Sequence, residues 1–135
     1  MEFFASLGQH TDVGLLALRI ALGATFIVHG LKKVGMWKMS SSEQMSKGML
    51  TLMRILSIAE TTGGIALIIG LFTQLAAIGL AVIMIGALYF KISIWSKKFS
   101  EDGGWEIDTL ILGATLLLFF AGAGAIGLDR VLFGL

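Results

Sequence analysis

The run LAAIGLAVIMIGALYF, from Leu75 to Phe90, contains only apolar side chains, glycine and one tyrosine. With the residues that follow as far as Ile94, it is long enough to cross a bilayer, for which an α-helix needs about 20 residues. Lys91, near the far end, can extend its ammonium group to the membrane surface. The sequence therefore predicts a membrane-spanning helix over residues 75–94.

Three further apolar segments accompany this run, and we expect helices over 13–31, 53–71 and 105–127. Buried helices of soluble proteins have shorter apolar segments, of about 10–14 residues. The chain is 56% hydrophobic and 14% charged, whereas soluble domains carry about 25% charged residues. We predict an all-α fold, with residues 1–135 forming a single transmembrane domain built as a left-handed, membrane-embedded four-helix bundle.

The segment from Ser40 to Arg54 is more polar than the spans on either side. Ser40 and Glu43 have the spacing of a capping box, and Met45, Met49 and Met53 then recur every four residues. This pattern favours a short amphipathic helix at the membrane surface, either separate from the second spanning helix or running straight into it. A polar loop with a single helical turn is the alternative.

Composition and charge exclude several classes of function. The net charge of +1 gives a nucleic-acid partner no electrostatic support, and without cysteine the chain forms no disulfide and no thiolate metal site. The residues before Val13 include Glu2 and Asp12 but no lysine or arginine, so the basic region of a secretory signal is missing. We expect the first apolar segment to be retained as a helix.

The basic residues are distributed unevenly and predict an orientation. Most of the ten flank the first or the third loop, while the second loop has none; the flanking residues are Lys32, Lys33, Lys38, Lys47, Arg54, Lys91, Lys97 and Lys98. Because loops rich in lysine and arginine stay in the cytoplasm, we expect a multi-pass protein of the cell (inner) membrane. Loops one and three would be cytoplasmic and both termini outside.

Arg19 and Glu60 are charged residues inside predicted spans. An arginine at the centre of a span costs about 2.5–3.5 kcal/mol and is not deprotonated, so it needs a partner or water. Counted from the middles of their spans, the two residues differ in depth by roughly 7 Å at 1.5 Å per residue. We therefore predict a buried Arg19–Glu60 pair, which either fixes helix register or lines a polar ligand pocket.

A second polar cluster is expected near the basic side of the membrane. His29 is close to the end of the first span, and Glu106 and Asp108 begin the fourth. Because histidine titrates near neutral pH, contact with either carboxylate would suit proton handling; simple solvation at the interface is the alternative. One histidine and two carboxylates do not define a metal site, and we predict none.

Several short motifs, in order along the chain, resemble the DoxX family of small four-helix membrane proteins. The resemblance covers nearly the whole chain and is carried by Leu18-Arg19, Leu22-Gly23, His29-Gly30-Leu31-Lys32-Lys33, Glu60, Gly63-Gly64, Gly70-Leu71-Phe72-Thr73, Gly103-Gly104-Trp105-Glu106, Gly122-Ala123-Gly124 and Leu128-Asp129. The chain departs from the family pattern at Gln74, Ile107 and Ala123, where arginine, an aromatic residue and proline are common. The resemblance implies a membrane subunit linked to redox complexes, some of which reduce quinones during sulfur oxidation while others handle oxidative stress.

Three functions remain open on the sequence. The first is a subunit of a membrane redox complex that binds a quinone, a quinol or a similar apolar ligand near Arg19 and Glu60, with His29 or Glu106 passing the proton. No covalently bound cofactor and no complete catalytic site are expected, so electrons would come from a membrane or peripheral redox partner. The alternatives are a non-catalytic scaffold or assembly factor and, ranked last, a small-molecule carrier, for which four helices would need to form a homo-oligomer.

Overall fold

The described part of the protein is helical, as the apolar segments predict. The computed structural model describes residues 8–42 and 45–134, and the extended pairing there is one isolated bridge, between Ser42 and Met45. In chain order the elements are η1 (Gly8–His10), α2 (Thr11–Lys32), η2 (Lys33–Trp37), α3 (Lys47–Ile69), α4 (Thr73–Tyr89), η3 (Phe90–Ile94), α5 (Glu106–Ala121) and α6 (Leu128–Phe133).

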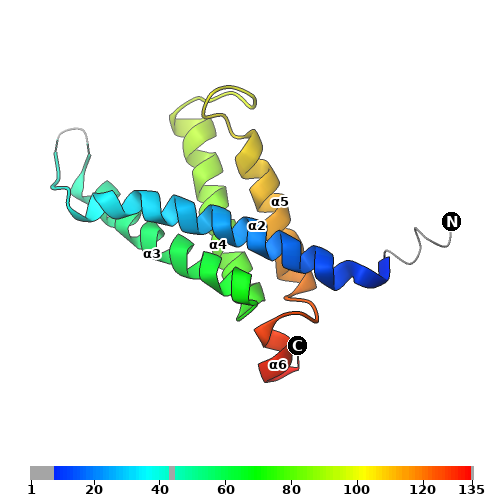
Figure 1. Cartoon of the computed structure of the whole chain (residues 1–135). Helices are drawn as coiled ribbons and strands as arrows, with labels where there is room; N and C mark the ends of the chain where they lie inside the picture. The colour runs from blue at the N-terminus through cyan, green and yellow to red at the C-terminus, as the bar shows by residue number, and fades with distance from the viewer. Residues whose placement is uncertain (1–7, 43–44, 135) are drawn as a thin grey trace.

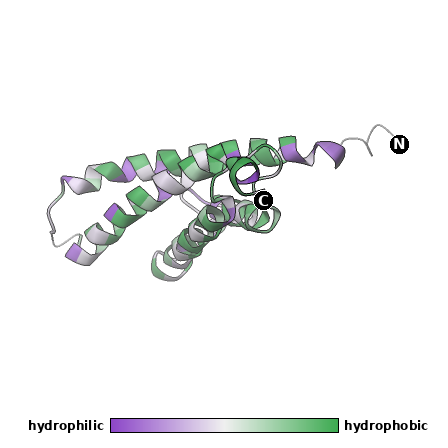
Figure 2. Cartoon of the chain, turned by 90° about the horizontal axis from the view of Figure 1, so that it is seen from below, coloured by the Kyte–Doolittle hydropathy of each residue, from purple (hydrophilic) through white to green (hydrophobic). Residues whose placement is uncertain are grey.

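The helices form two antiparallel hairpins that diverge from the turn between α3 and α4 (Figure 1). One hairpin consists of α2 and α3, the other of α4 and α5, and α6 lies beneath the point where they meet. The view from below in Figure 2 shows the same divergence, with α4 and α5 running away from the α2–α3 hairpin. The expected bundle is therefore all-helical, but the four helices lie together only near this junction.

Three helical segments of the described chain are long and apolar enough to cross a membrane: Thr11–Trp37, Lys47–Ile69 and Thr73–Ile94. The fourth expected span is shorter, because α5 has 16 residues and ends at Ala121 instead of 127. At 1.5 Å per residue, α5 is about 24 Å long, less than the hydrocarbon core of about 30 Å. It ends where Gly122 and Gly124 both adopt φ values of +74°, a conformation outside the helical range.

The expected surface helix before the second span is not a separate element. Ser40 lies outside any helix, and Glu43, its proposed capping partner, lies outside the described residues. Ser46 is the cap instead, because its side chain accepts a hydrogen bond of 3.2 Å from the main-chain N–H of Met49. The expected helix at 53–71 therefore begins earlier, at Lys47, and the methionines from Met49 onward belong to α3.

Small residues set how α2 and α3 pack. A Cβ atom added to Gly23 would lie 2.5 Å from the main-chain oxygen of Gly64, and one added to Gly30 would lie 2.8 Å from that of Ser57. The Ser57 hydroxyl donates a hydrogen bond of 2.9 Å to the carbonyl of Gly30. Backbones this close to each other are typical of membrane helix pairs, and these contacts fix the register of the hairpin.

The apolar core lies at the junction of the two hairpins. It contains Leu22 and Phe26 of α2, Leu67 of α3, Leu80 of α4 and Leu118 of α5. Large apolar side chains on the helices also face outward; they include Leu75, Val82, Leu110 and Phe120, which are 61–78% exposed. Figure 2 shows hydrophobic residues along the outer faces of the helices. Such surfaces suit a lipid bilayer, and the protein is accordingly an integral membrane protein.

Candidate functional site

Arg19 is completely buried at the junction and binds main-chain oxygens. Its Nη1 donates to the carbonyl of Leu67 at 3.5 Å, and its Nη2 donates to the carbonyl of Ile126. Leu67 lies in the last turn of α3, where the helix dipole is negative, and its carbonyl also accepts the main-chain N–H of Gly70 at 3.2 Å. The arginine thus joins the end of α3 to the segment that follows α5.

Asp129, at the start of α6, performs the complementary role at the start of α4. Its Oδ1 accepts a hydrogen bond of 2.6 Å from the N–H of Phe72, and its Oδ2 accepts one of 2.8 Å from the N–H of Thr73. The main-chain N–H of Asp129 donates to the carbonyl of Gly70 at 2.8 Å. Because Phe72 offers no side-chain cap, this distant carboxylate satisfies the first N–H groups of α4.

Gly70 lies at the centre of these contacts. It adopts φ +69°, and an added Cβ atom would lie 1.9 Å from Nη1 of Arg19 and 2.8 Å from Cα of Gly127. Only glycine combines this left-handed conformation with such close neighbours. We call the group formed by Arg19, Gly70, Phe72, Thr73 and Asp129 the turn clasp.

The predicted pairing of Arg19 with Glu60 does not form. The contacts of Gly23 with Gly64 and of Gly30 with Ser57 place Arg19 level with the end of α3. Glu60 lies about eight residues before that end of α3, or roughly 12 Å away at 1.5 Å per residue. The depth estimate from span midpoints was wrong because glycine contacts, not span centres, set the register.

Glu60 instead forms an ion pair with Lys33, which follows α2 directly. The Glu60 side chain is 6% exposed and that of Lys33 22%. The second hairpin repeats the arrangement, with Lys91 of η3 paired to Asp108 of α5 and also donating to the carbonyl of Gly104 at 3.0 Å. Each hairpin therefore carries a lysine after its first long helix and a carboxylate on its second.

His29 does not meet the carboxylates of α5. His29 is exposed, Asp108 is bound by Lys91, and Glu106 is partly exposed. The expected contact is absent because the hairpins diverge, so the end of α2 and the start of α5 lie far apart (Figure 1). Among the described residues, no group of three or more histidine, aspartate and glutamate side chains could hold a metal ion.

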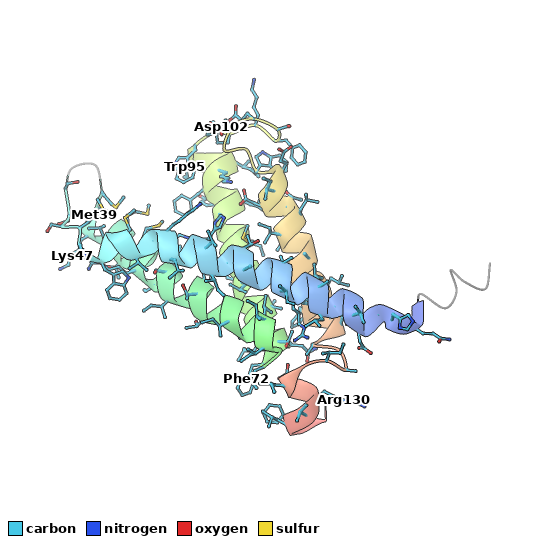
Figure 3. The ribbon with its side chains drawn as sticks, in the orientation of Figure 1. Met39, Lys47, Phe72, Trp95, Asp102 and Arg130 are labelled. Atoms are coloured by element: carbon cyan, nitrogen blue, oxygen red, sulfur yellow. The ribbon has the colours of Figure 1, made fainter. Side chains whose placement is uncertain are left out.

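Two adjoining hollows open near the turn between α3 and α4. The α3–α4 groove has a volume of about 370 Å³ and is lined by Ala59, Thr62, Gly63, Ala66, Phe72, Leu75, Ala76, Gly79, Leu80 and Ile83. The turn pocket has a volume of about 380 Å³ and is lined by Phe72, Thr73, Gln74, Leu75, Asp129 and Phe133. Phe72 and Leu75 belong to both linings, so the two hollows are neighbours. Figure 3 shows Phe72 at this end of the molecule, near α6.

Asp129 and Thr73 were missed as site residues by sequence reasoning. Asp129 entered the sequence analysis only as part of the motif Leu128-Asp129, with no role assigned to it. A usable signal was present, because the short turn before Thr73 contains no Ser, Asp or Asn to cap α4. An uncapped helix start beside a buried arginine calls for a carboxylate from elsewhere in the chain.

These features define a small helical membrane protein whose buried charges join its two hairpins. The family model for DoxX matches residues 14–93. A protein of Haemophilus influenzae, named only "Uncharacterized protein", is 34% identical over 131 residues, covering 95% of this chain and 97% of that one. A Bacillus subtilis protein named "Putative oxidoreductase CatD" is 29% identical over 123 residues, covering 90% and 89%. No solved structure matches. The chain belongs to the DoxX family.

Proposed function

We propose that the protein is a subunit of a membrane redox complex and binds a quinone, a quinol or a similar apolar ligand in the α3–α4 groove. The observation that carries the proposal is the groove itself, a hollow of about 370 Å³ on an outer face of the junction. Small-molecule sites in proteins are typically about 300–1,000 Å³ in volume. The redox assignment draws on the relative that is named as an oxidoreductase.

The lining of the groove suits an apolar ligand that arrives from the bilayer. None of its lining residues is charged, and alanine and glycine supply much of its surface. Gly79 has open space around the position of a Cβ atom, with no atom within 4 Å. The hydroxyl of Thr62 is already bound to the carbonyl of Ile58 at 2.8 Å, so it does not make the groove polar. A ring or an isoprenoid chain would bury apolar surface there.

In this proposal a partner protein supplies or accepts the electrons. The chain has no cysteine for thiol redox chemistry. Basic side chains that carry no ion pair among the described residues, including Lys32, Lys38 and Lys98, lie at the loop-one and loop-three ends. They would favour docking of an acidic face of that partner.

A groove-filling variant tests the ligand site directly. We would titrate decylubiquinone into the full chain in lipid nanodiscs and compare the wild type with Gly79→Leu. The matched control is Gly86→Leu, on the same helix with equally open surroundings but outside the groove. We expect binding at least about tenfold weaker in Gly79→Leu, because the added side chain occupies the space of the ligand, and unchanged in the control. Equal binding by all three proteins would refute the groove as the site.

A scaffold for a membrane complex is the second candidate function. The diverging hairpins favour it, since they leave long apolar helix faces with no neighbour among residues 8–42 and 45–134 (Figure 1). Photo-crosslinking in native membranes from Val82 and Leu110 would separate the two functions. One reproducible protein partner, with no quinone bound by the purified chain, would favour the scaffold.

A further inference from the structure

The turn pocket contains a polar atom that the fold leaves without a partner. Thr73 lines the pocket and is completely buried, and its Oγ1 has no hydrogen-bond partner among the described residues. A buried hydroxyl without a partner is uncommon because it loses its bonds to water on folding. An unpaired hydroxyl at a pocket therefore indicates that something else completes its hydrogen bonding.

Asp129 provides a second polar group on the same wall. Its two oxygens each accept one main-chain N–H, yet a carboxylate has about four lone-pair directions and can accept further donors. The carboxylate lies at the start of α4 and close to Arg19. The turn pocket thus offers a hydrogen-bond acceptor, which suits a ligand group that has a proton to donate.

Two aromatic side chains also line the pocket. The rings of Phe72 and Phe133 lie with their centroids 5.6 Å apart and tilted by 33°, and both side chains are about half exposed. Aromatic rings make flat apolar contacts with another ring. Since Phe72 and Leu75 line both hollows, a molecule with its ring in the turn pocket could extend an apolar chain along the α3–α4 groove.

We propose that the turn pocket binds the hydroxyl-bearing ring of an amphipathic ligand, with the ring hydroxyl donating to Asp129 and hydrogen-bonded to Thr73 Oγ1. The ligand chain lies in the α3–α4 groove, so this proposal rests on the proposed function for that groove. It adds that the site selects between the reduced and the oxidised form of the ligand. A hydroquinone has hydroxyl groups that can donate to a carboxylate, whereas a quinone presents only acceptors to it. The site therefore favours the reduced, proton-carrying form.

The test compares two ligands with the same ring and chain, a quinol with two hydroxyl donors and its dimethyl ether, in which methyl groups replace the two hydroxyl hydrogens. We would measure binding of decylubiquinol and of its dimethyl ether to the full chain in lipid nanodiscs by calorimetry without oxygen. We expect the wild type to bind the quinol about tenfold more tightly than the ether, the effect of one or two net hydrogen bonds. In Thr73→Val the affinity for the quinol should fall about threefold, because the ring oxygen that donates to Asp129 loses the hydrogen bond it accepts from the Thr73 hydroxyl.

Thr62→Val is the matched control, since Thr62 lines the groove but bonds its own helix. It should keep the wild-type preference. Equal binding of the quinol and the ether by the wild type would overturn the selection while leaving the groove as a site. An unchanged quinol affinity in Thr73→Val would overturn the proposed bond from Thr73. The comparison of the quinol with the ether uses the wild-type protein, so it does not depend on whether a variant folds. If neither ligand binds, both this proposal and the proposed groove site fail.

Discussion

The two ends of the molecule use buried charge in different ways. At the turn clasp, Arg19 is completely buried, Asp129 is 7% exposed, and both bind main-chain atoms at helix termini. At the loop ends, Lys33–Glu60 and Lys91–Asp108 pair side chain to side chain, and the lysine side chains are 22% and 23% exposed. The clasp joins four segments, whereas each loop-end pair joins the two helices of one hairpin.

This difference predicts where the protein tolerates change. A buried charge that loses its partner cannot reach water, so removal of one member of a buried pair is severe. A lysine near a helix end can instead extend to the membrane surface when its carboxylate is lost. We therefore expect the clasp to control folding and the joining of the hairpins, and the loop-end pairs to be dispensable for both.

Removal of Asp129 should have the largest effect. Asp129→Ala leaves Arg19 without its nearby counter-charge and two N–H groups of α4 without an acceptor. We expect a loss of about 3–5 kcal/mol in the free energy of unfolding. The measurement is thermal unfolding in mild detergent, followed by the fraction of monodisperse protein. Asp102→Ala, on an exposed loop, is the control and should change little; equal losses in the two variants would contradict the clasp.

A methyl group at Gly70 should come next. In Gly70→Ala the new Cβ atom would lie 1.9 Å from the Arg19 guanidinium, and the residue would keep a φ of +69°. Left-handed strain costs about 1–2 kcal/mol and overpacking about 1–3 kcal/mol, so we expect a loss of about 2–5 kcal/mol. Gly86→Ala, which has no atom within 4 Å, should be neutral or slightly stabilising in the same unfolding assay. A stable Gly70→Ala would show that the turn does not have this geometry.

The loop-end pairs should be less sensitive. Glu60→Gln removes the charge that pairs with Lys33, and Asp108→Asn does the same for Lys91. Because each lysine can turn toward water, we expect a loss of about 1 kcal/mol in either variant. Losses as large as that of Asp129→Ala would erase the distinction between the two ends of the molecule.

Labelling of introduced cysteines sharpens the comparison by placing each end on a side of the membrane. The chain has no cysteine of its own, so the maleimide labels only the introduced residue. Ser41→Cys in the first loop should react with an impermeant maleimide only from the cytoplasm, and Gln74→Cys, beside the second turn, only from outside. Labelling of Gln74→Cys only from the cytoplasm would reverse the predicted orientation.

The helices were largely predictable because charge-free runs are long and directly visible in the sequence. The expected span 75–94 coincides closely with α4 and η3, and 13–31 lies within α2. The errors occur where one of several similar residues determines the point at which a helix begins or ends. Ser46, not Ser40, caps α3, and Gly122 ends α5 before the apolar composition does.

The site was less predictable because it depends on register between helices. Arg19 and Glu60 are both buried, as expected, but the contact between Gly23 and Gly64 separates them along the hairpin. The sequence shows which charges are inside the membrane, yet not which helix faces meet. Asp129 is distant in sequence from both Arg19 and Thr73, and only the folded turn brings the three residues together.

The central claim is that Arg19 depends on Asp129 and not on Glu60. A double-mutant cycle on unfolding free energy in detergent tests it, with Arg19→Met combined in turn with Asp129→Asn and with Glu60→Gln. We predict a coupling energy of about 1–3 kcal/mol between Arg19 and Asp129, and one within about 0.5 kcal/mol of zero between Arg19 and Glu60. The reverse result, with strong coupling to Glu60 and none to Asp129, would contradict the turn clasp and restore the pairing expected from the sequence.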